Sequence, residues 1–135
     1  MKTLLLLALL LCSLLSCKKT VENAQRDAVV DIMVSGQWSV TKYMKGDSTI
    51  TPQFAPYKFQ FHDNGSVDAI RNGMLEKTGT WKGDATLLTI TSSFPGAPYP
   101  LPLLNGTFQI TKTGLSSVEA RMLLNGETHL LRLDK

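Results

Sequence analysis

A two-residue alternation of apolar and polar side chains, interrupted by Asn-Gly pairs, constrains this sequence more than any other feature. Residues 57–62 place an aromatic ring at every second position, and residues 118–122 alternate apolar with charged side chains. Such alternation indicates strands with one buried and one solvated face. Eight strands are predicted in this way, at residues 36–43, 57–62, 66–71, 76–82, 87–92, 107–111, 116–123 and 128–134.

Asn-Gly pairs occur at residues 64–65, 72–73, 105–106 and 125–126, and three of the four lie in short links between predicted strands. Both residues tolerate the positive φ that a type I′ hairpin turn requires. Hairpins between successive strands produce an up-and-down meander, and closing such a meander removes its exposed edges. The sequence therefore predicts an all-β domain over residues 36–135, built as an eight-stranded antiparallel up-and-down barrel.

One short amphipathic helix is predicted in front of the barrel. Thr20 is a possible N-cap, and Gly36 ends the helical pattern. The apolar residues that recur at three- and four-residue spacing are Val21, Ala24, Ala28, Val29, Ile32 and Met33. We expect this apolar stripe to cover the adjacent end of the barrel.

The N-terminal segment has the pattern of a lipoprotein signal. Lys2 precedes a leucine-rich stretch that is shorter than the about 20 apolar residues needed to cross a bilayer. The stretch ends at Leu14-Leu15-Ser16-Cys17, which resembles a lipobox and implies a signal peptide at residues 1–16 and a lipidated Cys17. Cys12 is a weaker acceptor, because Leu11 is too bulky for the cleavage position. The alternative is an ordinary secretory signal followed by an incidental cysteine.

Cleavage would leave residues 17–35 as a lipidated cysteine, a linker and the helix, followed by the barrel. The processed chain has no second cysteine, so we expect no intramolecular disulfide. Removing the signal lowers the formal net charge from +3 to +2, because Lys2 is its single charged residue, and this mild charge argues against a nucleic-acid partner. We expect a cell-envelope protein held to a membrane through Cys17. Lysine in place of aspartate at position 18 favours the outer membrane over the inner.

Four motifs, in this order, resemble the lipocalin-like domains of Bacteroidota lipoproteins. They are Gly36-Gln37-Trp38, the stretch 59–67 around Asn64-Gly65, Gly79-Thr80-Trp81, and Leu88-Thr89-Ile90. The resemblance implies a lipocalin-like barrel whose first strand depends on Gly36 and Trp38. It also implies an arginine, near the end of the barrel, that packs across the first tryptophan. Arg132 is the match by position and residue type.

Two long connections, residues 44–56 and 93–106, lie at the same end of an up-and-down barrel, opposite the helix. Connections longer than about 12 residues are usually functional or disordered, so we expect this end to be a binding mouth. With Trp38, Phe59 and Trp81 facing inward, strand parity places five further side chains near the mouth: Lys42, Tyr57, Arg71, Lys77 and His129. Such a ring suits an anionic headgroup or a carboxylate. The alternative is that the rim cations extend into solvent without a specific role.

The predicted interior is aromatic and aliphatic. Its inward residues are Trp38, Tyr57, Phe59, Phe61, Trp81, Phe108, Ile110, Met122 and Leu131. Phe59, Trp81, Phe108 and Met122 are candidate ligand contacts, but eight strands enclose a space that side chains alone can fill. Residues 93–104 contain four prolines and are a lid over the mouth, a docking strip for a partner, or a stiff connector packed on the barrel wall.

The sequence favours a binding protein over an enzyme. Its two histidines, His62 and His129, lie on separate predicted strands without metal-ligand spacing, and no nucleophile or nucleotide motif occurs. We therefore expect no catalytic site, no metal and no cofactor. The preferred hypothesis is a membrane-anchored lipocalin-like lipoprotein that binds a small apolar or amphipathic ligand. The alternative is a protein-interaction lipoprotein with a filled barrel, such as a hydrolase inhibitor or an accessory subunit of an envelope complex.

Overall fold

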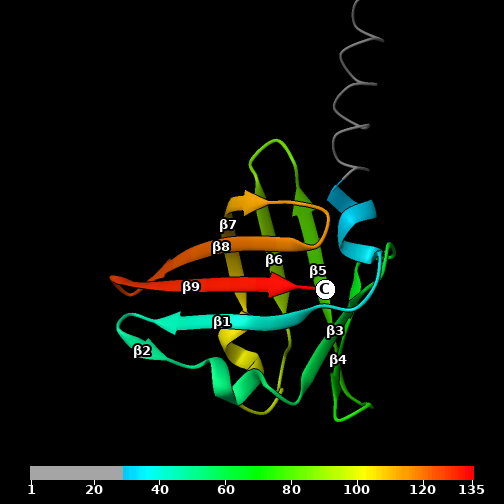
Figure 1. Ribbon diagram of the computed structural model, residues 1–135, viewed down its shortest axis with the longest axis horizontal. Coiled ribbons are helices and arrows are strands. Elements are labelled where there is room, and N and C mark those ends of the chain that lie inside the picture. The colour runs from blue at the N-terminus through cyan, green and yellow to red at the C-terminus, as the bar shows by residue number, and fades with distance from the viewer. Residues whose placement is uncertain (1–28) are drawn as a thin grey trace, which may run out of the picture.

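Nine strands form one antiparallel sheet in the computed structural model, which describes residues 29–135 (Figure 1). The order of the strands across the sheet is β2-β1-β9-β8-β7-β6-β5-β4-β3. The strands are β1 (Ser39–Lys45), β2 (Ser48–Thr49), β3 (Tyr57–Phe61), β4 (Ser66–Arg71), β5 (Met74–Asp84), β6 (Thr89–Ser93), β7 (Gly106–Thr113), β8 (Ser117–Leu124) and β9 (Glu127–Asp134). Two short 3-10 helices interrupt the long connections: η1 (Thr51–Phe54) and η2 (Leu101–Leu104). The predicted signal peptide and Cys17 lie outside the described residues.

The predicted all-β antiparallel fold is confirmed, with one strand more than expected. Each predicted strand has a counterpart, and strands β3 to β9 pair with their neighbours in sequence. The additional strand is β2, a two-residue return within the first long connection that pairs with β1 through Met44 opposite Thr49. Strand β6 begins at Thr89 rather than at residue 87, because residues 85–88 form the preceding turn.

The sheet curls until its two ends meet at one bridge. Trp38 donates its backbone N–H to the carbonyl of Phe59 (2.9 Å), and Phe59 donates its own N–H to the carbonyl of Trp38 (2.8 Å). On its other side β1 pairs with β9, so the first strand joins the last and also touches β3. In Figure 1, strands β1, β9 and β8 cross in front of β5 and β6, which gives the two layers of the barrel.

The N-terminal helix ends at Val34, and Gly36 follows it with φ of +83°. Glycine is favoured at a helix C-terminus with positive φ because it lacks a Cβ. The indole N–H of Trp38 then donates to the carbonyl of Met33 (2.8 Å), which fixes the helix end to the first strand. The helix lies at the end of the barrel opposite η1 and η2, as predicted (Figure 1). Residues 20–28 of the predicted helix lie outside the described part.

The interior is apolar and follows the predicted alternation. Eight of the nine residues expected to point inward are buried, and Leu131 is partly buried against them. Aromatic rings dominate, with Phe61 and Trp81 in an edge-to-face contact (5.1 Å between centroids). His129 is buried with them and is 2% exposed.

A β-bulge reverses the expected direction of Lys42. The register of β1 against β9 shifts between Val40 and Lys42, so Tyr43 becomes the next buried residue after Val40. Lys42 is exposed on the outer face, and its predicted place at the mouth is therefore wrong. A bulge inserts one residue into a strand, which inverts the side-chain parity beyond it.

Lys135, not Arg132, packs against the first tryptophan. The Lys135 ammonium lies 4.9 Å from the centre of the Trp38 ring, a distance suitable for a cation–π contact. Arg132 instead forms ion pairs with Glu119 (2.9 Å) and Asp134 (2.9 Å), and its side chain is 42% exposed. The expected contact of Arg132 with Trp38 is therefore wrong.

The Asp134 pair predicts an acid-dependent loss of stability. Hydrogen bonds from Arg132 and from the Thr41 hydroxyl lower the pKa of Asp134. Because its folded pKa lies below the unfolded value of about 3.9, these bonds stabilise the fold above that pH and are lost as pH falls through the folded pKa. We expect Asp134→Asn to lower the melting temperature at pH 7 and the deficit to shrink below about pH 4. Circular dichroism melts from neutral to acidic pH measure this, with Asp63→Asn in an exposed turn as control. A deficit that does not change with pH would contradict the assignment.

Candidate functional site at the capped end of the barrel

Residues 94–105, which we call the cap, close the long-loop end of the barrel. The apolar side chains of Phe94, Leu101 and Leu104 are buried, and Phe54 of η1 is buried at the same end. Backbone hydrogen bonds within the cap include Leu101 N–H to the carbonyl of Pro98 (3.0 Å). Its buried side chains agree with a lid and with a stiff connector packed on the barrel, two of the three roles considered for this segment.

Gly79 provides the space in which the cap is seated. A Cβ on Gly79 would lie 2.3 Å from the carbonyl oxygen of Ser93 and 2.8 Å from Cδ1 of Phe94. The Phe94 ring also meets Phe59 edge-to-face at 6.2 Å between centroids. The glycine of the second Gly-x-Trp motif therefore has a local role, which is to let Phe94 pack directly on β5.

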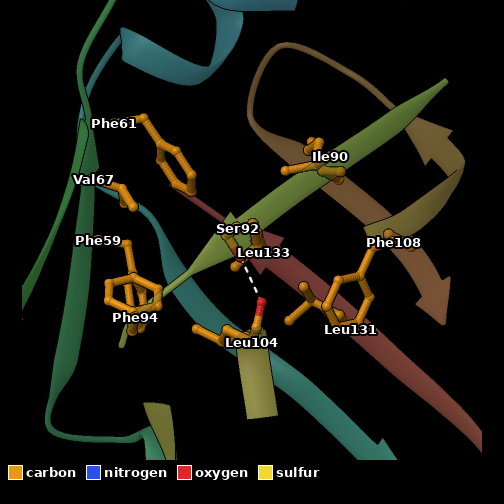
Figure 2. Close-up of a pocket in the computed structure, with 12 residues that line it drawn as sticks. Phe59, Phe61, Val67, Ile90, Ser92, Phe94, Leu104, Phe108, Leu131 and Leu133 are labelled. Carbon is orange, nitrogen blue, oxygen red and sulfur yellow. Dashed lines mark hydrogen bonds between the residues drawn. The ribbon is translucent and has the colours of Figure 1, made fainter. Parts of the chain in front are cut away.

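Two hydrogen bonds join the barrel to the cap. The Ser92 hydroxyl donates to the carbonyl of Leu104 (2.5 Å), as Figure 2 shows, and the Tyr43 hydroxyl donates to the carbonyl of Leu103 (2.7 Å). A third bond closes the base of the cap, where Phe94 N–H donates to the side-chain oxygen of Asn105 (2.6 Å). We call the Tyr43 and Ser92 bonds the latch.

His129 lies beneath the cap and supports the latch. Its Nδ1 is 2.8 Å from the Tyr43 hydroxyl oxygen. Since the single hydroxyl hydrogen of Tyr43 goes to Leu103, Nδ1 must carry the hydrogen and donate it to Tyr43. Burial, followed by the effect of Tyr99, raises the pKa of Tyr43 far above its usual range, so this hydroxyl stays protonated. His129 is thus near the predicted mouth but is covered by the cap.

The expected ring of cations does not assemble. Arg71 lies 3.6 Å from Glu76 and 6.0 Å from the centre of the Tyr57 ring, and Tyr57 donates its hydroxyl to Glu76. Burial and the Glu76 contact raise the pKa of Tyr57 to about 12. Strand parity did not predict Glu76 at this site, because Glu76 is the extra residue on β5 where the register against β4 shifts between Ala69 and Ile70. Its carboxylate offsets the Arg71 charge.

A narrow apolar cavity lies beneath the cap (Figure 2). Its volume is about 30 Å³. Pockets for small molecules usually measure about 300–1,000 Å³. The lining residues are Phe59, Phe61, Val67, Ile90, Ser92, Phe94, Leu104, Phe108, Val118, Ala120, Leu131 and Leu133.

Only some predicted ligand contacts meet at this cavity. Phe59 and Phe108 line it, whereas Lys42, Tyr57, Arg71, Lys77, Trp81, Met122 and His129 do not. Trp81 instead donates its indole N–H to the carbonyl of His62 (2.8 Å). Lys77 of β5 is half-buried and lies opposite Ala69 of β4. Whether any of these residues contacts a ligand stays a prediction. The cap residues were missed individually, because a loop sequence does not show which of its apolar side chains turn inward.

Within residues 29–135, no group of three or more His, Cys, Asp or Glu side chains is arranged to hold a metal ion. No helix in the same part of the chain is both long enough and apolar enough to cross a membrane.

A helix-flanked antiparallel barrel, closed by the bridge between Trp38 and Phe59 and apolar inside, defines the lipocalin-like class of folds. The structure is similar to a lipocalin-like protein from Bacteroides uniformis, with a TM-score of 0.51 and 19% identity over 73% of this chain and 96% of that one. It is also similar to a DUF4847 family protein from Bacteroides vulgatus, with a TM-score of 0.55 and 13% identity over 78% of this chain and 96% of that one. The sequence matches no protein-family model and no curated protein. The predicted lipocalin-like resemblance is therefore confirmed at the level of the fold.

Proposed function

We propose that this protein is a lipid-anchored lipoprotein of the cell envelope whose barrel binds a small apolar or amphipathic molecule beneath the cap. The observation that carries the proposal is the composition of the cavity wall. Phe94 and Leu104 belong to the cap, and the remaining lining residues belong to strands. If the cap moved away, the space now filled by Phe94 and Leu104 would join the cavity. No pair of strands would have to separate.

The lining sets the chemistry of the ligand. Ser92 is the one polar side chain among the twelve lining residues, and its hydroxyl is already used by Leu104. Burying an unpaired polar group costs free energy, so the inserted part of the ligand should be a hydrocarbon chain or ring. Because the closed cavity is far below ordinary ligand size, binding requires the cap to move.

Weakening the latch should accelerate ligand exchange. Tyr43→Phe and Ser92→Ala each remove one hydrogen bond to the cap, which contributes about 0.5–1.5 kcal/mol. We expect the association and dissociation rate constants of a fluorescent fatty acid to rise about 2- to 10-fold in stopped-flow measurements. Thr91→Ala is the matched control, because it removes the bond to Thr107 (2.9 Å) on the exposed face of the same strand. Unchanged rates in both latch variants, or no saturable binding in any of the proteins, would contradict the proposal.

The anchor has its own test. We expect Cys17→Ala to abolish incorporation of labelled palmitate. Cys12→Ala should leave the labelling unchanged, apart from any effect on export. Labelling that persists in Cys17→Ala would refute the assignment of the lipidated residue. Fractionation of the two membranes tests the expected outer-membrane location.

A protein partner is the second candidate, and the small cavity volume favours it. The cap also carries Tyr99 on its outer surface, where 59% of the residue is exposed. Under this hypothesis the barrel is a filled scaffold and the cap surface makes the contact. Tyr99→Ala would then reduce cross-linking to an envelope protein, while fatty-acid probes would fail to bind the wild type.

A further inference from the structure

Three leucines are exposed at the end of the barrel that carries the N-terminal helix. Leu87 and Leu88 belong to the β5–β6 turn, and Leu115 belongs to the β7–β8 turn. They are 64%, 47% and 78% exposed. In Figure 1 the β5–β6 turn lies at the top of the barrel, and the β7–β8 turn lies beside the helix. Large apolar side chains therefore project into solvent from two neighbouring turns.

The first of these turns is built to hold its leucines outward. Leu88 has φ of +53°, a left-handed conformation in which glycine or asparagine is usually found. Its carbonyl accepts the N–H of Ile110 (2.7 Å), and Asp84 accepts the N–H of Leu87 (2.9 Å), so the backbone is fixed. A strained residue that is held in place in this way is a reason to look for a function.

An apolar groove connects the turns with the helix. It has a volume of about 90 Å³ and is lined by Val29, Ile32, Met33, Leu88, Ile90, Ile110, Thr113 and Val118. The charges beside the first turn have both signs, with Lys82 next to Asp63 and Asp84. The end of the barrel therefore offers apolar area beside a small group of charges of both signs.

The position of the anchor indicates what covers this surface. Cys17 precedes Val29 by twelve residues, which span at most about 40 Å when fully extended. A lipid on Cys17 would therefore tether the helix end of the barrel within about 40 Å of the bilayer. We propose that Leu87, Leu88 and Leu115 insert into the membrane to which the chain is anchored, so that the cap faces away from it. This inference rests on the proposed lipidation of Cys17.

Hydrogen exchange on tethered protein tests the docking independently of lipidation in the cell. Residues 17–135 are coupled through the Cys17 thiol to a maleimide lipid in phosphatidylcholine vesicles, so the tether exists even if Cys17→Ala shows that the cell does not acylate it. Compared with the protein free in solution, we expect the amides of residues 85–88 and 114–116 to exchange at least several-fold more slowly. The amides of Gly96, Ala97 and Tyr99 in the cap should not change.

A matched pair of variants separates insertion from simple proximity. Leu87→Ser with Leu115→Ser should abolish the protection at both turns. Leu123→Ser with Leu124→Ser removes two exposed leucines from β8 and should retain it. Equal exchange in tethered and free protein would overturn the proposal. So would protection that survives the turn variant, or protection that appears in the cap instead.

Discussion

Trp38→Ala should reduce the free energy of unfolding by about 3–5 kcal/mol, the range observed when a large buried aromatic side chain is truncated. Trp38 is fully buried, pairs with Phe59 at the one bridge that closes the sheet, and bonds the end of the helix through Met33. The mutation therefore removes core volume and the connection between the helix and the barrel. Urea denaturation followed by circular dichroism measures the change.

Two controls define the role of Trp38. Trp38→Phe keeps most of the apolar volume but leaves the carbonyl of Met33 without its donor, so we expect a smaller loss of about 1–3 kcal/mol. Leu123→Ala removes apolar atoms from an exposed position and should change stability by about 0.5 kcal/mol or less. If Trp38→Ala cost no more than Leu123→Ala, Trp38 would not be part of the closure of the barrel.

Gly79→Ala should be the most damaging glycine-to-alanine change in the described part of the chain. The new Cβ would meet a backbone oxygen, that of Ser93 at 2.3 Å, and the Phe94 ring at 2.8 Å. Overpacking of this kind costs about 1–3 kcal/mol and occasionally more, and we expect the upper part of this range because a paired strand cannot withdraw. The cheaper relaxation is for Phe94 to leave its site, which would lift the cap.

The Gly79 variant therefore tests the cap as well as stability. Binding of a hydrophobic dye such as anilinonaphthalene sulfonate, together with urea denaturation, should show lost stability and newly exposed apolar surface. Gly114→Ala is the matched control, because a Cβ there has its closest neighbour at 3.9 Å. A Gly79→Ala protein as stable as wild type, with no added dye binding, would contradict the seating of Phe94 on β5.

The strands and hairpins could be predicted because their signals are local. The alternation of 57–61 matches the burial of β3, and the turns 72–73 and 125–126 have positive φ at both the asparagine and the glycine. Type I′ turns require this pair of conformations, so the dipeptide itself carries the information. The Gly-x-Trp start likewise marked the end of the helix and the first strand.

The site could be predicted only in outline, because bulges and loop packing depend on the whole fold. The bulge in β1 turns Tyr43 inward, to the latch, in place of Lys42. The register shift of β5 at Ile70 turns Glu76 toward Arg71 and Tyr57. No local pattern marks either bulge. The long loops were correctly placed opposite the helix, but burial of Phe94 depends on a missing Cβ in a strand distant from the cap.

Native mass spectrometry of residues 18–135, purified under mild conditions from the native host, tests the proposed binding most directly. We expect a discrete additional mass that disappears on denaturation and that returns when the stripped protein is incubated with fatty acids or isoprenoids. A bare polypeptide mass that stays bare after these incubations would contradict binding beneath the cap and leave the filled scaffold with a protein partner.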